Sequence, residues 1–280
     1  MIKSILVCTD GSANGNAACD LAFHLAQKIR AQAAGLHVLD SRVLEGPLMA
    51  DISGWLGTTP YADHLQQFRL LLEQKGAAIA EALEKAAASA GLTVECRIKM
   101  GHPARVILEE EVHAELVVLG QRGEHAEFAG DVAGTIAERV VRRSNKPCLL
   151  ATKTFKPINK ILAAYDGSSH ASKALHEAIE LALAARVPLV VLSVAEHHDS
   201  DAAQEYVHSA MRLVRAHECP AAPMIAKGPA GPTILRIAEE ISADLIVVGE
   251  FGHTRVHELV LGSTSSLLMS RSNKPVLFVR

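Results

Sequence analysis

An internal duplication constrains this chain more than any other feature of its sequence. Residues 2–12, IKSILVCTDGS, return as INKILAAYDGS at residues 158–168. Residues 114–123, AELVVLGQRG, return as ADLIVVGEFG at residues 243–252. A period of about half the chain is too long for a solenoid, whose units have about 20–50 residues. The chain is therefore predicted to contain two copies of one domain.

The boundary between the copies is predicted at residues 154–157, where an apolar run ends and the second copy begins. The two domains are accordingly residues 1–153 and residues 158–280. A length of 280 residues suits two domains, and a hydrophobic fraction of 49% is enough to fill two cores.

Strands and helices are expected to alternate within each copy. In the first copy the apolar runs predicted as strands lie at residues 5–8, 36–39, 94–98, 116–119 and 148–151. Between them, apolar residues recur at helical spacing, and Pro103 is expected to open a helix that continues through Val112. Alternating helices and apolar strands predict an α/β fold with a parallel sheet that is covered on both faces. Each copy is therefore expected to be a doubly wound domain.

The first copy carries an insert at residues 42–61 that glycines and prolines punctuate, and we interpret it as a loop. The insert holds Trp55, which is the only tryptophan of the chain. Either Trp55 packs the loop onto its own domain, or the loop is a lid or a partner-binding surface.

A glycine-containing segment follows the fourth predicted strand of the second copy. The apolar run at residues 245–248 ends at Gly249, and Gly252, Gly262 and Ser263 follow at the spacing G-x2-G-x9-G-S. Glycines let a backbone approach a ligand closely, and free N–H groups at a helix start favour anions. The spacing therefore indicates a phosphate site, whereas any one of these glycines alone would be explained by a turn.

This spacing, with the strand before it and SNKPVL after it, resembles the ATP-binding pattern of universal stress proteins. The resemblance covers nearly the whole chain, twice. It implies the strand order 3-2-1-4-5 in each domain. It also implies pairing of the two domains through their last strands, as an intrachain pseudo-dimer.

The resemblance also implies which residues hold the nucleotide. An aspartate after the first strand, a valine at the end of the second and the glycine segment are expected to converge. In the second copy these are Asp166, Val194, Gly249, Gly252, Gly262, Ser263 and Thr264. The first copy offers a less regular set, Asp10, Val38, Gly120, Arg122, Gly123, Gly134 and Thr135.

Each copy departs from the family pattern once. The second copy has Glu250 where many relatives have a basic residue, and this carboxylate would either repel phosphates or hold Mg²⁺. The first copy has the basic Arg122, but ten residues separate Gly123 from Gly134, one more than the nine between Gly252 and Gly262. Because backbone N–H groups do most of the work of binding phosphate, we expect the second copy to be the better site. Asp10 and Asp166 would alternatively cap the helices that follow them.

The function expected from the resemblance is stress-response regulation through binding of ATP or a related adenine nucleotide, alone or with Mg²⁺. A slow ATPase or autophosphorylating enzyme and a nucleotide-free interaction scaffold are the alternatives. The sequence has no P-loop, no G-x-G-x-x-G after the first strand and no G-x-S-x-G elbow. No catalytic or metal-ligating residue is assigned.

Composition limits the partners and the compartment. The net charge is −3 with Lys and Arg dispersed, so no nucleic-acid surface is expected. The five widely separated cysteines suit reduced thiols in the cytoplasm. No apolar run approaches the roughly 18 residues of a membrane span. The expected partners are the nucleotide and the other domain of the same chain, and self-association of whole chains is left open.

Overall fold

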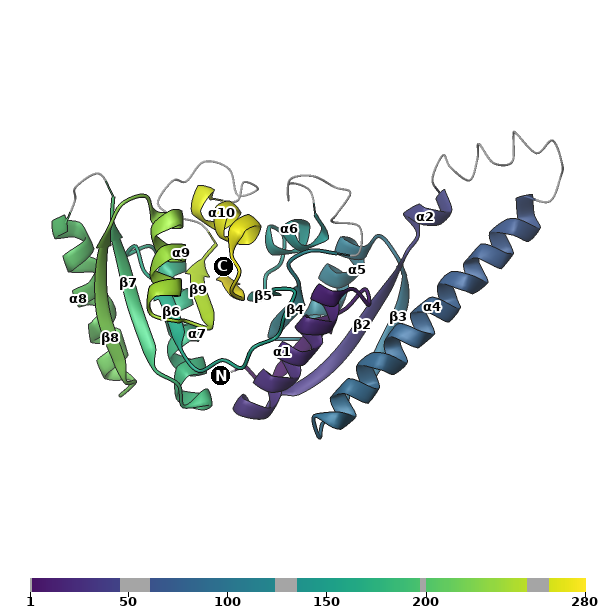
Figure 1. The fold of residues 1–280 in the computed structure, drawn as a ribbon, viewed down its shortest axis with the longest axis horizontal. Coiled ribbons are helices and arrows are strands. Elements are labelled where there is room, and N and C mark those ends of the chain that lie inside the picture. Colours follow the sequence, from purple (N-terminus) through teal and green to yellow (C-terminus); the bar gives the residue numbers. More distant parts are fainter. Residues whose placement is uncertain (1, 46–60, 124–134, 197–199, 251–261) are drawn as a thin grey trace.

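The two halves share one continuous ten-stranded sheet in the computed structural model, which describes residues 2–45, 61–123, 135–196, 200–250 and 262–280 (Figure 1). The strand order is β3-β2-β1-β4-β5-β10-β9-β6-β7-β8. The strands are β1 (Ser4–Cys8), β2 (Gln32–Asp40), β3 (Cys96–Gly101), β4 (Leu116–Gly120), β5 (Cys148–Ala151), β6 (Ile161–Ala164), β7 (Leu189–Ala195), β8 (Ala221–Lys227), β9 (Leu245–Gly249) and β10 (Val276–Val279).

Helices cover both faces of this sheet. On one face α1 (Ala13–Ile29), α4 (Tyr61–Ser89), α7 (Ser169–Ala185) and α8 (Ser200–Ala216) pack into one hydrophobic cluster. On the other face α5 (Pro103–Glu110), α6 (Ile136–Val141), α9 (Ala230–Glu240) and α10 (Ser263–Arg271) pack into another. The described helices also include the short α2 (Arg42–Glu45) and the 3₁₀ turn Glu111–His113. None of the described helices is long and apolar enough to span a membrane.

Each half repeats the strand order 3-2-1-4-5, which confirms the predicted doubly wound fold. All strand pairs within a half are parallel. Val7 of the first strand, for example, lies between Gly35 of β2 and Val118 of β4. Because this order reverses direction beside the first strand, the carboxyl ends of the first, second and fourth strands meet at one crevice.

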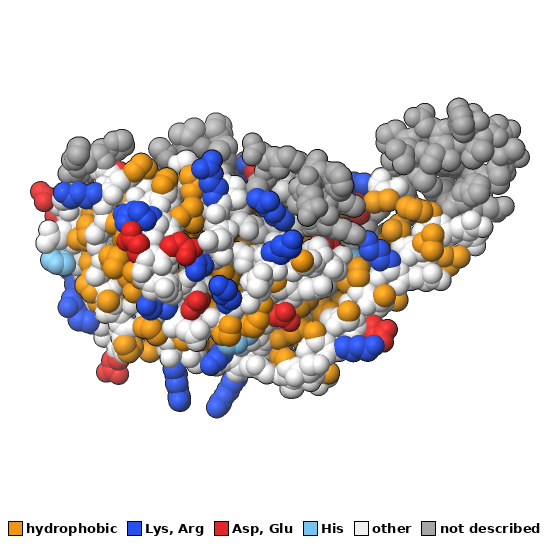
Figure 2. All heavy atoms as spheres, viewed as in Figure 1, with side chains coloured by type: hydrophobic (Ala, Val, Ile, Leu, Met, Phe, Trp, Pro, Cys, Tyr) orange, Lys and Arg blue, Asp and Glu red, His pale blue; other side chains and the backbone are white. Residues whose placement is uncertain are grey.

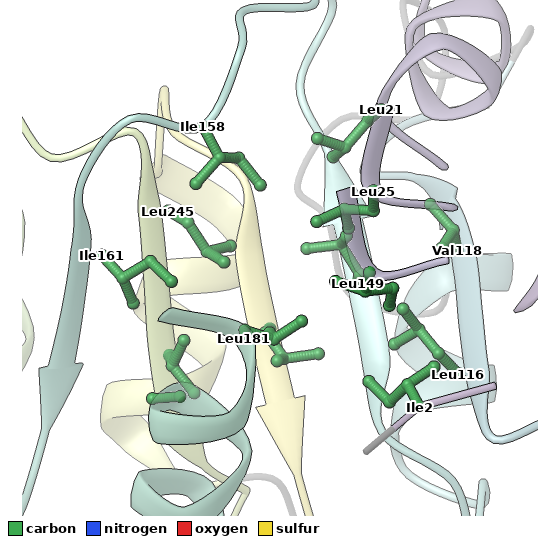
Figure 3. Packing of buried hydrophobic residues seen from close by; sticks show 14 of the residues in the cluster. Ile2, Leu21, Leu25, Leu116, Val118, Leu149, Ile158, Ile161, Leu181 and Leu245 are labelled. Atoms are coloured by element: carbon green, nitrogen blue, oxygen red, sulfur yellow. The ribbon is translucent and has the colours of Figure 1, made fainter. Parts of the chain in front are cut away.

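The halves join through their last strands. β5 and β10 pair antiparallel, with Leu149 opposite Leu277. The hydrophobic cluster on the α1 side continues across this junction, where Leu21 and Leu25 of the first half and Leu181 and Ile158 of the second are buried (Figure 3). An apolar strand that would be a free sheet edge in a single domain is thereby covered.

Three elements differ from the predictions by two or more residues in their limits. β3 spans residues 96–101 rather than 94–98, because an edge strand pairs on one side only and needs no continuous apolar run. The helix that Pro103 opens ends at Glu110, and Val112 lies in the 3₁₀ turn that follows. β2 begins at Gln32, four residues before its apolar run.

The first-half insert is partly helical. Arg42–Glu45 form α2 and Tyr61 begins α4, so interpreting the whole of residues 42–61 as a loop was wrong for these five residues. Trp55 lies outside the described residues. The helix α4 that follows is much longer than α8, its counterpart in the second half (Figure 1). Hydrophobic side chains remain exposed along α4 (Figure 2), where Leu70 and Leu71 are 50% and 60% exposed.

Candidate functional site

A cavity of about 460 Å³ opens at the carboxyl ends of β1, β2 and β4 in the first half. Three chain segments that are distant in sequence converge on it, as the family resemblance implies. Its lining includes six of the seven residues predicted for this half, namely Asp10, Val38, Gly120, Arg122, Gly123 and Thr135. The seventh, Gly134, lies outside the described residues.

The turn after β1 holds Asp10 at the cavity. Asp10 Oδ1 accepts a hydrogen bond from the Ser12 N–H at 3.0 Å. The cap of α1 is Ser12, whose Oγ accepts from the Gly15 N–H at 3.1 Å. The alternative role of Asp10 as the helix cap was therefore wrong. A Cβ atom on Gly123 would lie 3.1 Å from Asp10 Oδ2, so the glycine segment passes directly beside this carboxylate.

Two glycines at this site allow close backbone packing. A Cβ atom on Gly15 would lie 2.7 Å from Asp10 Oδ1, which is well inside contact distance. A Cβ atom on Gly120 would lie 2.8 Å from Asn14 Cβ in the first turn of α1. In the second half a Cβ atom on Gly249 would similarly lie 2.8 Å from the Ala171 nitrogen. The first glycine of each segment is therefore required to pack the helix after the first strand.

The cavity has an apolar floor and a charged rim. Leu36, Leu72, Ile107 and Leu119 are among the apolar residues that line it. The basic residues that line it are Arg42, Lys75, Arg122 and Arg139. This combination suits a ligand with an apolar ring and negatively charged groups, because each end finds its complementary surface.

Two polar groups on β2 complete the lining. His37 is buried, and its Nδ1 donates to the Thr9 carbonyl oxygen at 2.8 Å, because a carbonyl can only accept. Asp40 accepts from Arg42 Nε at 2.8 Å. Burial alone would raise the pKa of Asp40, but the hydrogen bonds and charge of Arg42 outweigh it and lower that pKa. Asp40 is therefore an ionised, paired group at the cavity rim.

Several lining residues were missed by the sequence analysis. Arg139 lies one helical turn after Thr135, and Lys75 lies on α4 with Leu72, one turn before it. Their role depends on how α4 and α6 cross the sheet, for which the sequence carries no signal. Gly15 did carry a signal, because a glycine in the first turn of an apolar helix often marks a close approach.

The second half repeats the turn but differs around it. Asp166 Oδ1 accepts from the Ser168 N–H at 3.0 Å, and Ser168 rather than Asp166 caps α7. Because β6 pairs with both β7 and β9, the carboxyl ends of these strands lie together. Asp166 follows β6, Val194 lies next to the last residue of β7 and Gly249 ends β9. Gly262 is the N-cap of α10, and Ser263 and Thr264 lie in its first turn. Gly252 lies outside the described residues.

Two features distinguish the second half from the first. Glu196, the counterpart of Asp40, accepts from the Ala230 N–H of α9 at 2.7 Å. The ring of Tyr206 covers Gly167, and a Cβ atom on Gly167 would lie 2.5 Å from that ring. In the first half Ile79 occupies the same place over Gly11.

Among the described residues no group of three or more His, Cys, Asp or Glu side chains could hold a metal ion.

The fold suggests membership of a protein family, and the match of the chain to a family model establishes it. The model of the universal stress protein family matches residues 1–152 and 157–280, which is nearly the whole chain. This chain belongs to the universal stress protein family. Its membership confirms the resemblance and places the chain among stress-response proteins.

Two related proteins match over the whole chain, and a third matches about half of it with nearly its full length. Universal stress protein Slr1230 of Synechocystis is 29% identical over 287 residues, with full coverage of both chains. A universal stress protein of Thermus aquaticus is 34% identical over 133 residues, which cover 43% of this chain and 97% of that protein. The crystal structure of a universal stress protein from Archaeoglobus fulgidus superposes with a TM-score of 0.75 at 22% identity, covering 99% of this chain and 98% of that one.

Proposed function

We propose that this universal stress protein binds ATP or a related adenine nucleotide and thereby acts as a stress-response regulator. Its action would be ligand-linked stabilisation of one conformation or partner-binding state. A reducing compartment such as the cytoplasm suits its five free cysteines. The observation that carries the proposal is the cavity of the first domain.

The cavity matches the chemistry of a nucleotide. Its volume of about 460 Å³ lies within the range of roughly 300–1,000 Å³ for small-molecule sites. The apolar floor around Leu36 and Ile107 suits a base, and Arg122 and Arg139 on the rim suit phosphates. Gly123 lets the backbone run close to Asp10, which leaves room for a ligand beside the strand ends.

The geometry supports the first domain, whereas the regular glycine spacing favours the second. We therefore propose the first-domain cavity as the principal site and retain Gly249, Gly252, Gly262, Ser263 and Thr264, with Asp166 and Val194, as a second site. Mg²⁺ would arrive with the nucleotide, since no protein ligand for it is proposed.

The test begins with purified full-length protein. Nucleotide released on heat denaturation is identified, and ATP affinity of the nucleotide-free protein is measured by calorimetry. The double variant Arg122→Ala/Arg139→Ala should bind ATP at least about 10-fold more weakly, because the loss of even one charged hydrogen bond costs about 1.5–3 kcal/mol and about 1.4 kcal/mol is a factor of ten in affinity. Arg105→Ala is the control, since its side chain is 78% exposed and pairs with Glu109 along α5.

The two sites are separated by a second variant. Gly262→Val should remove only the binding that the second domain contributes and leave the first-domain stoichiometry intact. If neither variant changes nucleotide binding, the assignment of both sites is wrong. If the parent binds no adenine nucleotide at all, the scaffold alternative replaces this proposal.

A further inference from the structure

The residue after the first glycine of each segment lies at the interface between the halves. It is Gln121 in the first half and Glu250 in the second. Their backbones are held alike, because the N–H of Gln121 donates to Ala151 O and that of Glu250 donates to Val279 O, both at 2.8 Å. Both residues are buried, with 7% and 2% exposed surface. The duplication has therefore placed an amide and a carboxyl group at matching positions.

Gln121 crosses the interface to the other half. Its Nε2 donates to the carbonyl oxygens of Met269 and Ser272, the latter at 3.2 Å. These carbonyls lie at the C-terminal end of α10, where a helix leaves its last carbonyl groups without intrahelical partners. The Gln121 amide thus acts as a cap that the first half supplies to the last helix of the second.

By the same correspondence between the halves, the helix end that matches the α10 end for Glu250 is the end of α6 in the first half. Ser144 is the counterpart of Ser272, and its carbonyl oxygen accepts from Arg280 Nη1 at 3.4 Å. Burial raises the pKa of the Cys148 thiol on β5 to about 12, and the charges of Glu111 and Glu250 add to that rise. Cys148 belongs to the first half, so the charge of Glu250 acts on a group across the interface.

The protonation state of Glu250 decides what it can bond. Its Oε1 is buried and has no hydrogen-bond partner among the described residues. A carboxylate can only accept, whereas a carboxylic acid carries one O–H donor. Backbone carbonyls at a helix end also only accept, so Glu250 can repeat the Gln121 contact only while it carries a proton.

The charged and titratable groups near Glu250 come from four elements. Arg280 follows β10, Cys148 lies on β5 with Glu111 beyond it, and His170 lies in the first turn of α7 beside Gly249. Burial raises the pKa of Glu250 to about 7, and the charge of Arg280 opposes that rise without cancelling it.

We propose that the two halves are held by one permanent and one proton-dependent contact, Gln121 capping α10 and protonated Glu250 capping the end of α6. Loss of the proton from Glu250 breaks the second contact and loosens that side of the interface. The stability of the interface thereby depends on pH. A variant with glutamine at position 250 as well as at position 121 would lack this dependence.

The sign of the effect follows from linkage. The folded pKa of Glu250 is about 7 against an ordinary value of 4.5. Between these values the folded protein holds a proton that the unfolded chain has lost, so stability falls as pH rises. The stabilising contribution is complete below about 4.5, declines up to about 7 and changes no further above it.

The experiment compares the full-length parent with Glu250→Gln, which places the Gln121 amide at both positions. Urea unfolding is measured at pH 5.5, 7 and 8.5. The ratio of the parent's unfolding constant to that of the variant should rise about tenfold or more from pH 5.5 to 8.5. Gln121→Glu is the matched reverse variant, and it should add a second decline in stability over the same range.

Two measurements separate this inference from a purely structural role. Hydrogen exchange of β5 and β10, corrected for intrinsic rates, should increase with pH in the parent and not in Glu250→Gln. The carboxyl carbon resonance that Glu250→Gln removes should titrate near pH 7 in the parent. A constant difference in stability at all three pH values, or a carboxyl midpoint near 4.5, would overturn the proposal.

Discussion

Replacing Gly120 by alanine should destabilise the protein even when no ligand is present. Gly120 ends β4 at the cavity, and an added Cβ atom would lie 2.8 Å from Asn14 Cβ, 2.9 Å from Asn14 C and 3.0 Å from Asn14 O. Two of these are backbone atoms of the first turn of α1, which cannot rotate away as a side-chain tip can. The helix or the strand must therefore move.

The size of the effect follows from these distances. Carbon atoms in favourable contact lie about 3.5–4.0 Å apart, so the overlap is roughly 0.7 Å or more. Overpacking a close-packed interior typically costs about 1–3 kcal/mol. We expect the free energy of unfolding to fall by that amount. Gly249→Ala should have a similar effect in the second half, where the same contact is made with His170 and Ala171.

Urea unfolding of the nucleotide-free protein measures this change. Gly231→Ala in α9 is the control, because its Cβ would lie 3.2 Å from the movable tip of Leu267. Alanine is also preferred to glycine within a helix by up to about 1 kcal/mol, so the control should be at least as stable as the parent. If Gly120→Ala keeps the stability of the parent and loses only ligand affinity, the glycine serves the ligand and the packing argument is wrong.

Two further predictions concern the chain as a whole. The two halves, residues 1–153 and 158–280, can be expressed separately. Each should self-associate, bind the other half or aggregate, because each exposes β5 or β10 as an apolar edge. Two monomers that do not bind each other in sedimentation would contradict the pairing in solution. ATP hydrolysis, if nucleotide binds, should be far slower than about 1 per second, the lower end of ordinary enzyme rates; steady turnover at or above that rate would favour the ATPase alternative.

The sequence determined the duplication, the fold class and the residues after the first, second and fourth strands. These could be predicted because central parallel strands are buried on both faces and appear as apolar runs, of which β5 was located at its observed limits, Cys148–Ala151. Asp10 follows β1, Val38 lies near the end of β2 and Gly120 ends β4, and parallel strands bring those ends together. The edge strand β3 was placed less well, since one-sided pairing leaves its pattern mixed.

Only the tertiary structure decided what the helices bring to the site and what crosses the interface. Lys75 and Arg139 reach the cavity because of the way α4 and α6 pack on the sheet, and helix crossing depends on many weak contacts at once. Glu250 was expected to face phosphate or Mg²⁺, yet its side chain is buried beside Arg280. Its counterpart Gln121 bonds Met269, 148 residues away in the chain. Such contacts exist only once both halves have folded and docked, because no local pattern links residues that far apart.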